Sequence, residues 1–279
     1  MSTRRPFRTR LFRPVVALVV VGLLCGVGVM GMGVHLGGIG NRGEGVLRGV
    51  AGGALRIATY NLNFERISPE TLDAVRTLDV DVVVLQETHP DWESALRETA
   101  LPWDNIYFQH SGLDGGMAVL SRYPVREMTW MPSQTGPFPA WHFELDVGEV
   151  TLDVLAVHLH PPLDERGLLT GYFTTAGLRR AELREHLDRL PRLPDLVLGD
   201  FNEMEGGSTA EMDARGLQSV QHAYPPVEPT WKWELDWVTL TGRPDHIFYG
   251  PRLRNTGAQV PLVGQSDHWP LWAVFEVVP

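Results

Sequence analysis

The residues of this sequence that could do chemistry lie in five short strings, each at the end of an apolar run. The strings are Tyr60-Asn61, Gln86-Glu87, Val157-His158, Gly199-Asp200-Phe201-Asn202 and Ser266-Asp267-His268. Carboxylate and amide oxygens, with no cysteine among them, suit Mg²⁺ or Mn²⁺ rather than zinc, and an imidazole can bind an anion or transfer a proton. Each string alone also has a structural interpretation, because a terminal Asn or Asp can cap a turn and a lone His can be a hydrogen-bonded core residue. Their common place at strand ends favours a shared site.

The apolar runs before these strings predict strands, and helical segments alternate with them. The predicted strands cover residues 55–61, 81–87, 116–120, 195–200, 246–249 and 269–278, with a hairpin over 142–158 that turns at Gly148. The predicted helices cover residues 68–78, with Ser68 as N-cap, 91–100, and a segment with one apolar face formed by Ala176, Leu183, Leu187 and Leu190 that ends at Pro191. This alternation predicts one α/β domain.

The first 53 residues differ in composition from the rest and are predicted to lie outside this domain. Residues 1–13 hold five arginines, residues 14–35 are largely apolar without Asp, Glu, Lys or Arg, and residues 36–53 are rich in glycine. An uncharged stretch of about 20 residues can span a bilayer as a helix, and the positive-inside rule places its basic end in the cytoplasm. We therefore expect a single-pass signal-anchor at 14–35, a flexible linker at 36–53 and an extracytoplasmic domain at 54–279. A cleaved signal peptide, which would secrete the domain, is the alternative.

The predicted domain is acidic. From residue 54 onward, 17 basic and 33 acidic residues give a net charge of −16, against −10 for the whole chain. Proteins hold duplex nucleic acid largely through cationic contacts to its phosphates. The charge therefore argues against a nucleic-acid substrate, although it leaves room for a local basic groove.

In their order along the chain, the strings resemble the motifs of the endonuclease/exonuclease/phosphatase superfamily. The specific pieces are Thr59-Tyr60-Asn61, Leu85-Gln86-Glu87, Gly116 through Pro124, Gly199-Asp200-Phe201-Asn202, Pro244-Asp245-His246-Ile247 and Ser266-Asp267-His268. The resemblance covers residues 55–278. It implies an α/β (α+β) four-layer sandwich, in which two mostly antiparallel sheets pack face to face with helices outside and the active site lies along one edge of the sheets. It also implies divalent-metal-dependent hydrolysis of phosphoester bonds.

The resemblance implies a metal site and a general base. Glu87 would be the principal ligand of Mg²⁺ or Mn²⁺, with Asn61 beside it, and Asp267 would ligate a metal or help to hold the neighbouring histidine. Asp200 would orient and deprotonate the attacking water. Asn202 would hold that aspartate or donate to phosphate.

Two phosphate-facing histidines are implied as well. His268 would contact the scissile phosphate, with Asp245 fixing its tautomer and favouring the imidazolium. His158 matches a position that binds phosphate or protonates the leaving oxygen, and His160, on the same face of the predicted strand, is the rival. Trp231 could stack on a base or a sugar, or pack in the core.

Three further features bear on the predicted site. Asn63 stands where exonuclease III-like repair enzymes carry an additional acidic ligand, so the sequence leaves open whether one or two metals bind. Arg179 and Arg180 could bind phosphate, but a solvated helix face is the favoured interpretation. Loops over the site are predicted to set specificity and to supply an aromatic lining. They cover residues 104–115, 131–141, 161–175 and 221–235, and the aromatic residues are Trp130, Phe138, Trp141, Phe173 and Trp231.

The expected function is a phosphoesterase for a lipid headgroup or a small phosphorylated molecule outside the cytoplasm, because a membrane tether and an acidic domain favour such a substrate. An extracytoplasmic nuclease that cleaves DNA or RNA is the alternative. A non-catalytic binding domain is least favoured, since the motif residues are all present. The sequence implies no protein partner, and we expect a monomer.

Overall fold

The computed structural model describes residues 33–35, 54–163, 168–223, 228–235 and 238–278. Most of the predicted signal-anchor and linker lies outside these residues, so the division of the N-terminal region stays a prediction. Within the described part of the chain, no helix is both long and apolar enough to cross a bilayer.

The first large sheet contains six strands. They are β2 (Ala54–Asn61), β3 (Val82–Gln86), β4 (Asn105–Gln109), β5 (Met117–Ser121), β14 (Leu253–Gln259) and β15 (Leu271–Val277). Their order across the sheet is β14-β15-β2-β3-β5-β4. Neighbouring strands pair antiparallel except β2 and β3, which are parallel and so end at the same edge.

The second large sheet also contains six strands. They are β6 (Val125–Met131), β7 (Ala140–Val147), β8 (Val150–His158), β9 (Leu196–Asp200), β10 (Gln218–Ser219) and β13 (Asp245–Tyr249). Their order is β10-β13-β9-β8-β7-β6. Only β8 and β9 are parallel among the described pairs. The two sheets therefore repeat one design, a parallel central pair with antiparallel neighbours.

The two sheets pack face to face around one apolar core. Side chains that alternate along the strands, such as Ile57 and Val84 of the first sheet and Phe143 and Leu198 of the second, are fully buried in a single cluster between them. Because successive side chains of a strand point to opposite faces, the other residues of these strands face outward and need a second cover. Helices provide it on both sides.

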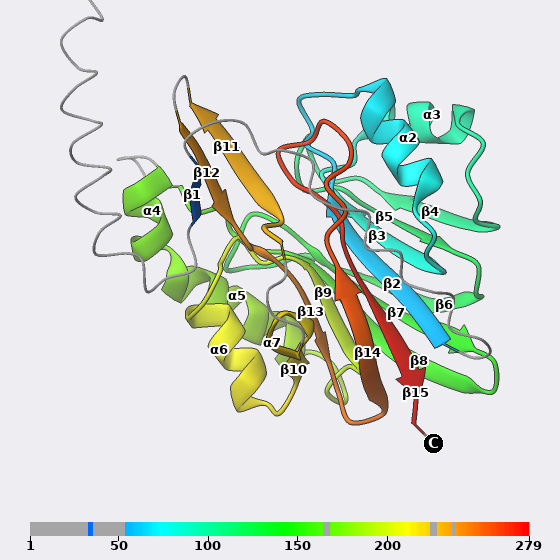
Figure 1. The fold of residues 1–279 in the computed structure, drawn as a ribbon. Helices are drawn as coiled ribbons and strands as arrows, with labels where there is room; N and C mark the ends of the chain where they lie inside the picture. The colour runs from blue at the N-terminus through cyan, green and yellow to red at the C-terminus, as the bar shows by residue number, and fades with distance from the viewer. Residues whose placement is uncertain (1–32, 36–53, 164–167, 224–227, 236–237, 279) are drawn as a thin grey trace, which may run out of the picture.

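Helices α2 (Pro69–Thr77) and α3 (Pro90–Glu98) cover the outer face of the first sheet, where Val75 and Trp92 are buried in one cluster with Val83. Helices α5 (Ala176–Asp188) and α6 (Gly207–Ala214) cover the second sheet, where Leu183 and Met212 are buried with Val197. Figure 1 shows the two helix pairs on opposite sides of the molecule. The predicted four-layer sandwich is confirmed.

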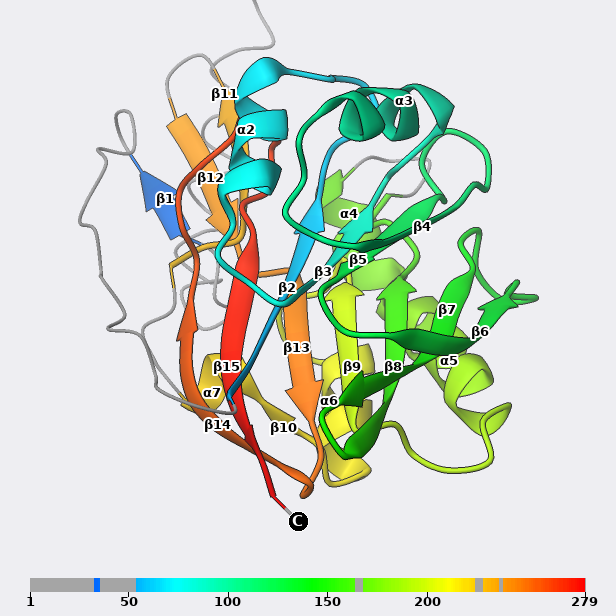
Figure 2. The same ribbon diagram turned by 90° about the vertical axis from the view of Figure 1, so that its right-hand side faces the viewer.

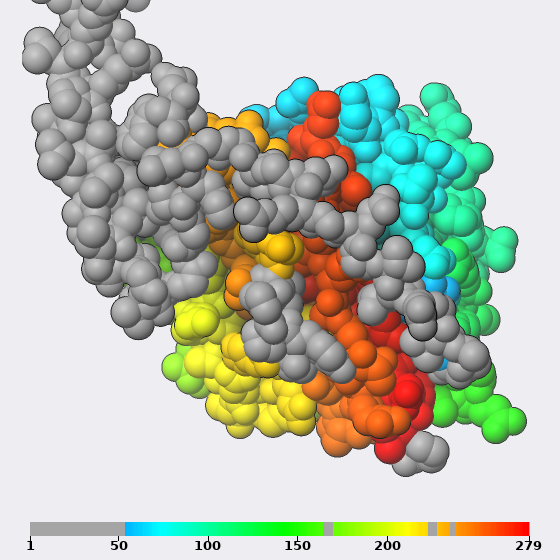
Figure 3. Space-filling model, in the orientation of Figure 1, coloured from blue at the N-terminus to red at the C-terminus, as the bar shows by residue number. Residues whose placement is uncertain are grey.

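A third, small sheet lies beside the site described below. It contains β1 (Gly33–His35), β12 (Val238–Gly242) and β11 (Trp231–Leu235), in that order. The strand β1 takes the last residues of the predicted 14–35 segment and pairs antiparallel with β12. Two short helices, α4 (Leu168–Thr174) and α7 (Val220–Ala223), complete the described elements. Figure 2 shows β11 and β12 apart from the two large sheets, and Figure 3 shows β14 (orange) at the surface between α6 (yellow) and α2 (cyan).

Several predicted loops prove to be regular structure. Residues 104–115 include β4, residues 161–175 include α4 and residues 221–235 include β11. The strand β4 escaped prediction because it is an edge strand with no alternation of buried and exposed residues. By contrast, the predicted N-cap of the first helix is confirmed, since the backbone N–H of Thr71 donates to the Ser68 hydroxyl at 3.1 Å.

Candidate active site

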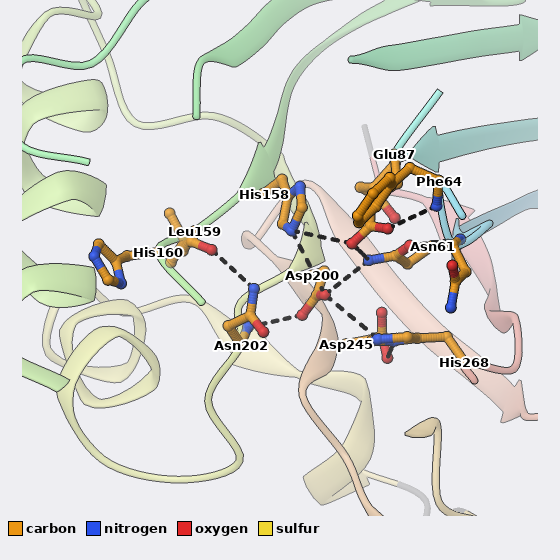
Figure 4. Close-up of polar contacts among 12 residues, drawn as sticks. Asn61, Phe64, Glu87, His158, Leu159, His160, Asp200, Asn202, Asp245 and His268 are labelled. Atoms are coloured by element: carbon orange, nitrogen blue, oxygen red, sulfur yellow. Dashed lines mark hydrogen bonds and ion pairs between the residues drawn. The ribbon is translucent and has the colours of Figure 1, made fainter. Parts of the chain in front are cut away.

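The strand register of the second sheet brings three predicted site residues into one row. On β9, Asp200 lies opposite His158 of β8 on one side and opposite Asp245 of β13 on the other. In the first sheet, Asn61 ends β2 opposite the last residue of β3, and Glu87 follows directly. Because both sheets end at this edge, the two sets of side chains meet, as Figure 4 shows.

An amide joins the two sheets at the site. The Nδ2 of Asn61 donates to Glu87 Oε1 at 2.9 Å and to Asp200 Oδ2 at 3.1 Å. The second oxygen of Glu87 accepts the backbone N–H of Phe64 at 2.9 Å. Glu87, Asn63 and Asn202 have positive φ angles, which non-glycine residues adopt at a cost of about 1–3 kcal/mol. The fold thus holds strained backbone at the positions that aim these side chains.

His268 lies between two carboxylates. Its Nδ1 is 2.9 Å from Asp245 Oδ2, and its Nε2 is 3.7 Å from Asp200 Oδ2. Burial alone would lower the pKa of His268, but the carboxylates of Asp245 and Asp200 raise it well above its usual value. The ring is therefore an imidazolium at neutral pH, as predicted from the aspartate behind it.

His158 has the opposite electrostatic character. It is buried, and its Nε2 is 3.9 Å from both Glu87 Oε1 and Asp200 Oδ2. Burial lowers the pKa of His158, although the charge of Asp200 opposes the shift. Its ring lies flat against Phe138, with ring centroids 4.1 Å apart and the planes 17° apart. The site therefore pairs one charged and one neutral imidazole.

Asp200 has the environment of a general base. Burial, with a smaller effect of the Asp245 charge, raises its pKa to about 6 against the opposing effects of His268 and His158. The backbone N–H of Asn202 donates to Asp200 Oδ1 at 2.7 Å, and the Asn202 amide donates to Leu159 O at 2.9 Å. Asn202 thus holds Asp200 through its backbone, which is one of the two roles predicted for it.

The cluster has more negative than positive charge. Its carboxylates are Glu87, Asp200, Asp245 and Asp267, and among the described residues no Arg or Lys forms an ion pair with any of them. Burial raises the pKa of Glu87, because moving its ionised carboxylate largely out of water costs free energy that no Arg or Lys of the described residues offsets. A bound divalent cation would remove this cost, so the residues fit the predicted metal.

Two groups of residues could hold that cation. Asp200, Asp245 and His268 have ligand atoms within 4.8 Å of one another. The His268 imidazolium already binds Asp245 and would repel a cation, so we favour the Glu87 side, where carboxylate and amide oxygens match the preference of Mg²⁺ or Mn²⁺. The amide nitrogen of Asn61 faces Glu87 and Asp200, and an amide nitrogen does not ligate a metal. Asn61 would therefore be a ligand only after its amide rotates to present the oxygen.

Asp267 lies next to this group rather than within it. Its Oδ1 accepts a hydrogen bond from Asn63 Nδ2 at 2.8 Å. Its backbone carbonyl accepts the N–H of Lys232 at 2.8 Å, and Trp231 forms an isolated antiparallel bridge with His268. The predicted metal role of Asp267 stays a prediction, and so do the two alternatives for Trp231, which is half-buried beside His268.

His160 is not brought to the cluster. Its Nδ1 donates to Pro161 O at 2.7 Å, and its backbone N–H donates to Glu182 Oε2 at 2.7 Å. Figure 4 shows its ring on the far side of Leu159 from the other side chains. The chain turns after β8 ends at His158, so the strand alternation that made the two histidines rivals does not continue.

The predicted solvated face at Arg179 is wrong. Arg179 is fully buried and donates to Thr175 Oγ1 at 2.7 Å and to Tyr172 O at 2.9 Å, with Glu203 Oε1 3.4 Å away. Arg180 instead pairs with Glu211 on the helix surface. Of the predicted aromatic lining, Trp141 packs in the core, whereas Phe138 stacks on His158 and Trp231 forms a backbone bridge with His268.

Glu182 is a site-adjacent residue that the sequence did not reveal. It is buried, and burial raises its pKa to about 7 although the nearby backbone N–H groups of His160 and Phe138 oppose the shift. Glu185 raises the same pKa and Arg179 lowers it. No motif contains Glu182, and its helix has few apolar residues on its buried face.

The pKa of Glu182 predicts a pH-dependent contribution to stability. The folded chain keeps the Glu182 proton up to about pH 7, whereas the unfolded chain, with the ordinary pKa of about 4.5, releases it at lower pH. We expect Glu182→Gln to gain stability relative to the natural chain as pH rises from 5 to 8, by at most roughly 3 kcal/mol. Urea unfolding at pH 5, 6, 7 and 8 measures this, and a pH-independent difference would contradict it.

Comparisons with known proteins identify the family and the fold. Residues 58–268 match the sequence profile of the Endonuclease/Exonuclease/phosphatase family. A humanized D. rerio TDP2 is similar with a TM-score of 0.63 and 18% identity, over 81% of this chain and 100% of that chain. D. rerio TDP2 complexed with a single-strand DNA product gives 0.62 and 17%, over 80% and 99%. An endonuclease/exonuclease/phosphatase from Beutenbergia cavernae gives 0.57 and 20%, over 81% and 72%. No curated protein matches the chain.

Proposed function

This chain belongs to the Endonuclease/Exonuclease/phosphatase family, whose members hydrolyse phosphoester bonds with divalent metals. From that premise we propose that it is a Mg²⁺- or Mn²⁺-dependent phosphoesterase. We propose that it acts outside the cytoplasm on a lipid headgroup or a small phosphorylated molecule. The observation that carries the proposal is the hydrogen-bonded bridge from Glu87 through Asn61 to Asp200. It places the half-buried carboxylate of Glu87 and the buried carboxylate of Asp200, from two sheets, beside two imidazoles of different charge.

In the proposed reaction, Asp200 takes the proton of the attacking water. Its pKa of about 6 leaves it ionised at neutral pH yet basic enough to accept a proton. His268, held by Asp245 at 2.9 Å, is the cationic donor to a phosphate oxygen. His158 faces the same space from the opposite side and binds phosphate or serves the leaving oxygen.

Glu87, with Asn61 and with Asp267 at the edge, would hold the cation. When bound, the cation neutralises phosphate charge in the transition state. The hydrogen bond from Phe64 N to Glu87 Oε2 fixes the carboxylate in place beforehand. The carboxylate of Glu87 is thus already oriented before a cation binds.

The preferred substrate class rests on charge and on the predicted anchor. The −16 charge of residues 54–279 opposes a long polyanion more than it opposes a single phosphate group. A signal-anchor at 14–35 would keep the site near a bilayer surface, where lipid headgroups are concentrated. The enzyme is proposed to act as a monomer without a protein partner.

An extracytoplasmic nuclease is the second candidate. The structure of D. rerio TDP2 complexed with a single-strand DNA product shares this fold at 17% identity. That complex shows that the fold can accommodate a DNA strand. Trp231, half-buried beside His268, is the residue of this chain on which a base could stack.

A substrate panel tests the proposal. We expect Mg²⁺-dependent, EDTA-sensitive hydrolysis of bis-p-nitrophenyl phosphate, and faster turnover of sphingomyelin or phosphatidylinositol phosphates in vesicles than of plasmid DNA or RNA at physiological salt. Efficient nicking of the plasmid would overturn the substrate preference in favour of the nuclease. Absence of hydrolysis of every substrate with Mg²⁺ or Mn²⁺ would sink the enzymatic proposal itself.

A further inference from the structure

The loop of residues 133–138 is tied to helix α5 by two glutamates one turn apart. Glu185 binds the outer part, since it accepts the N–H groups of Gln134 at 2.8 Å and Thr135 at 3.0 Å and the hydroxyl of Ser133 at 3.0 Å. Such charge-assisted hydrogen bonds are stronger than neutral ones. The outer loop is therefore fixed to the helix.

Glu182 binds the inner part of the same loop and also the end of β8. Its Oε2 accepts the N–H of His160 at 2.7 Å, and the backbone N–H of Phe138 lies close enough to the carboxylate to lower its pKa. At Gly136 an added Cβ would lie 1.8 Å from Glu182 Oε1, so the carboxylate occupies the space of a side chain there. One buried carboxylate thus joins two segments that lie on either side of His158.

Phe138, at the inner end of this loop, contacts the site directly. Its ring lies parallel to the imidazole of His158, with centroids 4.1 Å apart, and it is only 6% exposed. A flat contact of this kind fixes the plane of the imidazole, because rotation about the Cβ–Cγ bond would drive its edge into the phenyl ring. That plane directs the Nε2 of His158 toward Glu87 and Asp200 at 3.9 Å each.

We propose that Glu182 and Phe138 are positioning residues for His158. Glu182 holds the loop and the strand end together, and Phe138 sets the plane in which the imidazole meets the phosphate. The inference rests on the proposed function for its kinetic readout, but the geometry has a readout of its own. Neither residue touches the reacting atoms.

The spectroscopic test does not depend on activity. The ring current of Phe138 shifts the imidazole proton resonances of His158 upfield in histidine-labelled protein, and His158→Ala identifies them. We expect Phe138→Leu and Glu182→Ala to remove the shift, and Glu185→Ala, which loosens only the outer loop, to retain it. An unchanged shift in the folded Glu182→Ala variant would overturn the role of Glu182.

The kinetic test is a double-mutant cycle with bis-p-nitrophenyl phosphate. We expect Phe138→Leu and Glu182→Ala to lower kcat by roughly tenfold or more with little change in KM, and to cause no further loss in a His158→Ala background. Glu182→Gln keeps an acceptor oxygen and should retain most of kcat. The matched control Glu185→Ala should lower thermal stability with kcat nearly unchanged.

The outcomes separate the two proposals. Full additivity of the losses in the His158→Ala background would show that the two residues do not act through His158, and would overturn the inference while leaving the phosphoesterase intact. A chain without any hydrolysis but with the expected resonance shifts would keep the geometry and sink the function. If Glu182→Ala fails to fold, Phe138→Leu, which retains an apolar side chain, carries both measurements.

Discussion

Replacement of Asp200 by asparagine is expected to lower kcat by roughly 10³-fold at saturating Mg²⁺. The variant keeps the shape of the side chain but cannot accept the proton of the attacking water. The loss should fall on kcat more than on KM, because the base acts as the proton moves. Steady-state hydrolysis of bis-p-nitrophenyl phosphate measures both constants.

The structure also predicts that Asp200→Asn loses a hydrogen bond within the site. Both oxygens of Asp200 accept hydrogen bonds, from Asn61 Nδ2 and from Asn202 N, and an amide can accept only one of them. Retained Mg²⁺-induced thermal stabilisation would show that the site itself has survived. The exposed Asp213→Asn on α6 is the matched control and should keep full activity. A kcat for Asp200→Asn within tenfold of the natural value would rule out Asp200 as the base.

Much of the site could be predicted because its residues sit at strand ends. A strand that ends in Asn61 or Asp200 delivers that residue to the edge of its sheet whatever the rest of the fold does. The motif order then suggested which edges meet. The structure shows how the strand ends meet there. The pairs β2–β3 and β8–β9 are parallel, so both strands of each pair end at that edge.

The supporting residues could not be predicted in the same way. Arg179 and Glu182 look like surface residues of a helix, since burial of a charge is recognisable only when its partner is known. The only carboxylate paired with Arg179 among the described residues is Glu203, 24 residues away, and Glu182 accepts a backbone N–H from His160, 22 residues away. No local pattern encodes such pairings. Edge strands such as β14 were not predicted for a simpler reason. They are partly exposed to solvent, and their sequences hold few apolar residues, so the pattern that identifies a strand is missing.

Replacement of Glu87 by glutamine is expected to abolish Mg²⁺-dependent turnover, with at least a roughly 100-fold loss of kcat/KM at any practical Mg²⁺ concentration. The physical reason is the loss of the one site carboxylate that faces Asn61 from the first sheet. Titration of activity with Mg²⁺, and with Mn²⁺ in parallel, measures the effect. If the variant has the same Mg²⁺ activation curve as the natural chain, Glu87 is not a metal ligand.

The same variant separates metal binding from folding. Burial raises the pKa of Glu87, so the carboxylate costs stability when no cation is present, and Glu87→Gln should be at least as stable as the natural chain in EDTA. Mg²⁺ should then raise the Tm of the natural chain but not that of the variant, because a ligand stabilises only the state that binds it. Glu65→Gln, an exposed change in the neighbouring loop between β2 and α2, should keep the Mg²⁺-induced rise. If Glu87→Gln instead unfolds in EDTA while still responding to Mg²⁺, Glu87 is a structural residue and the cation is held by Asp200, Asp245 and His268.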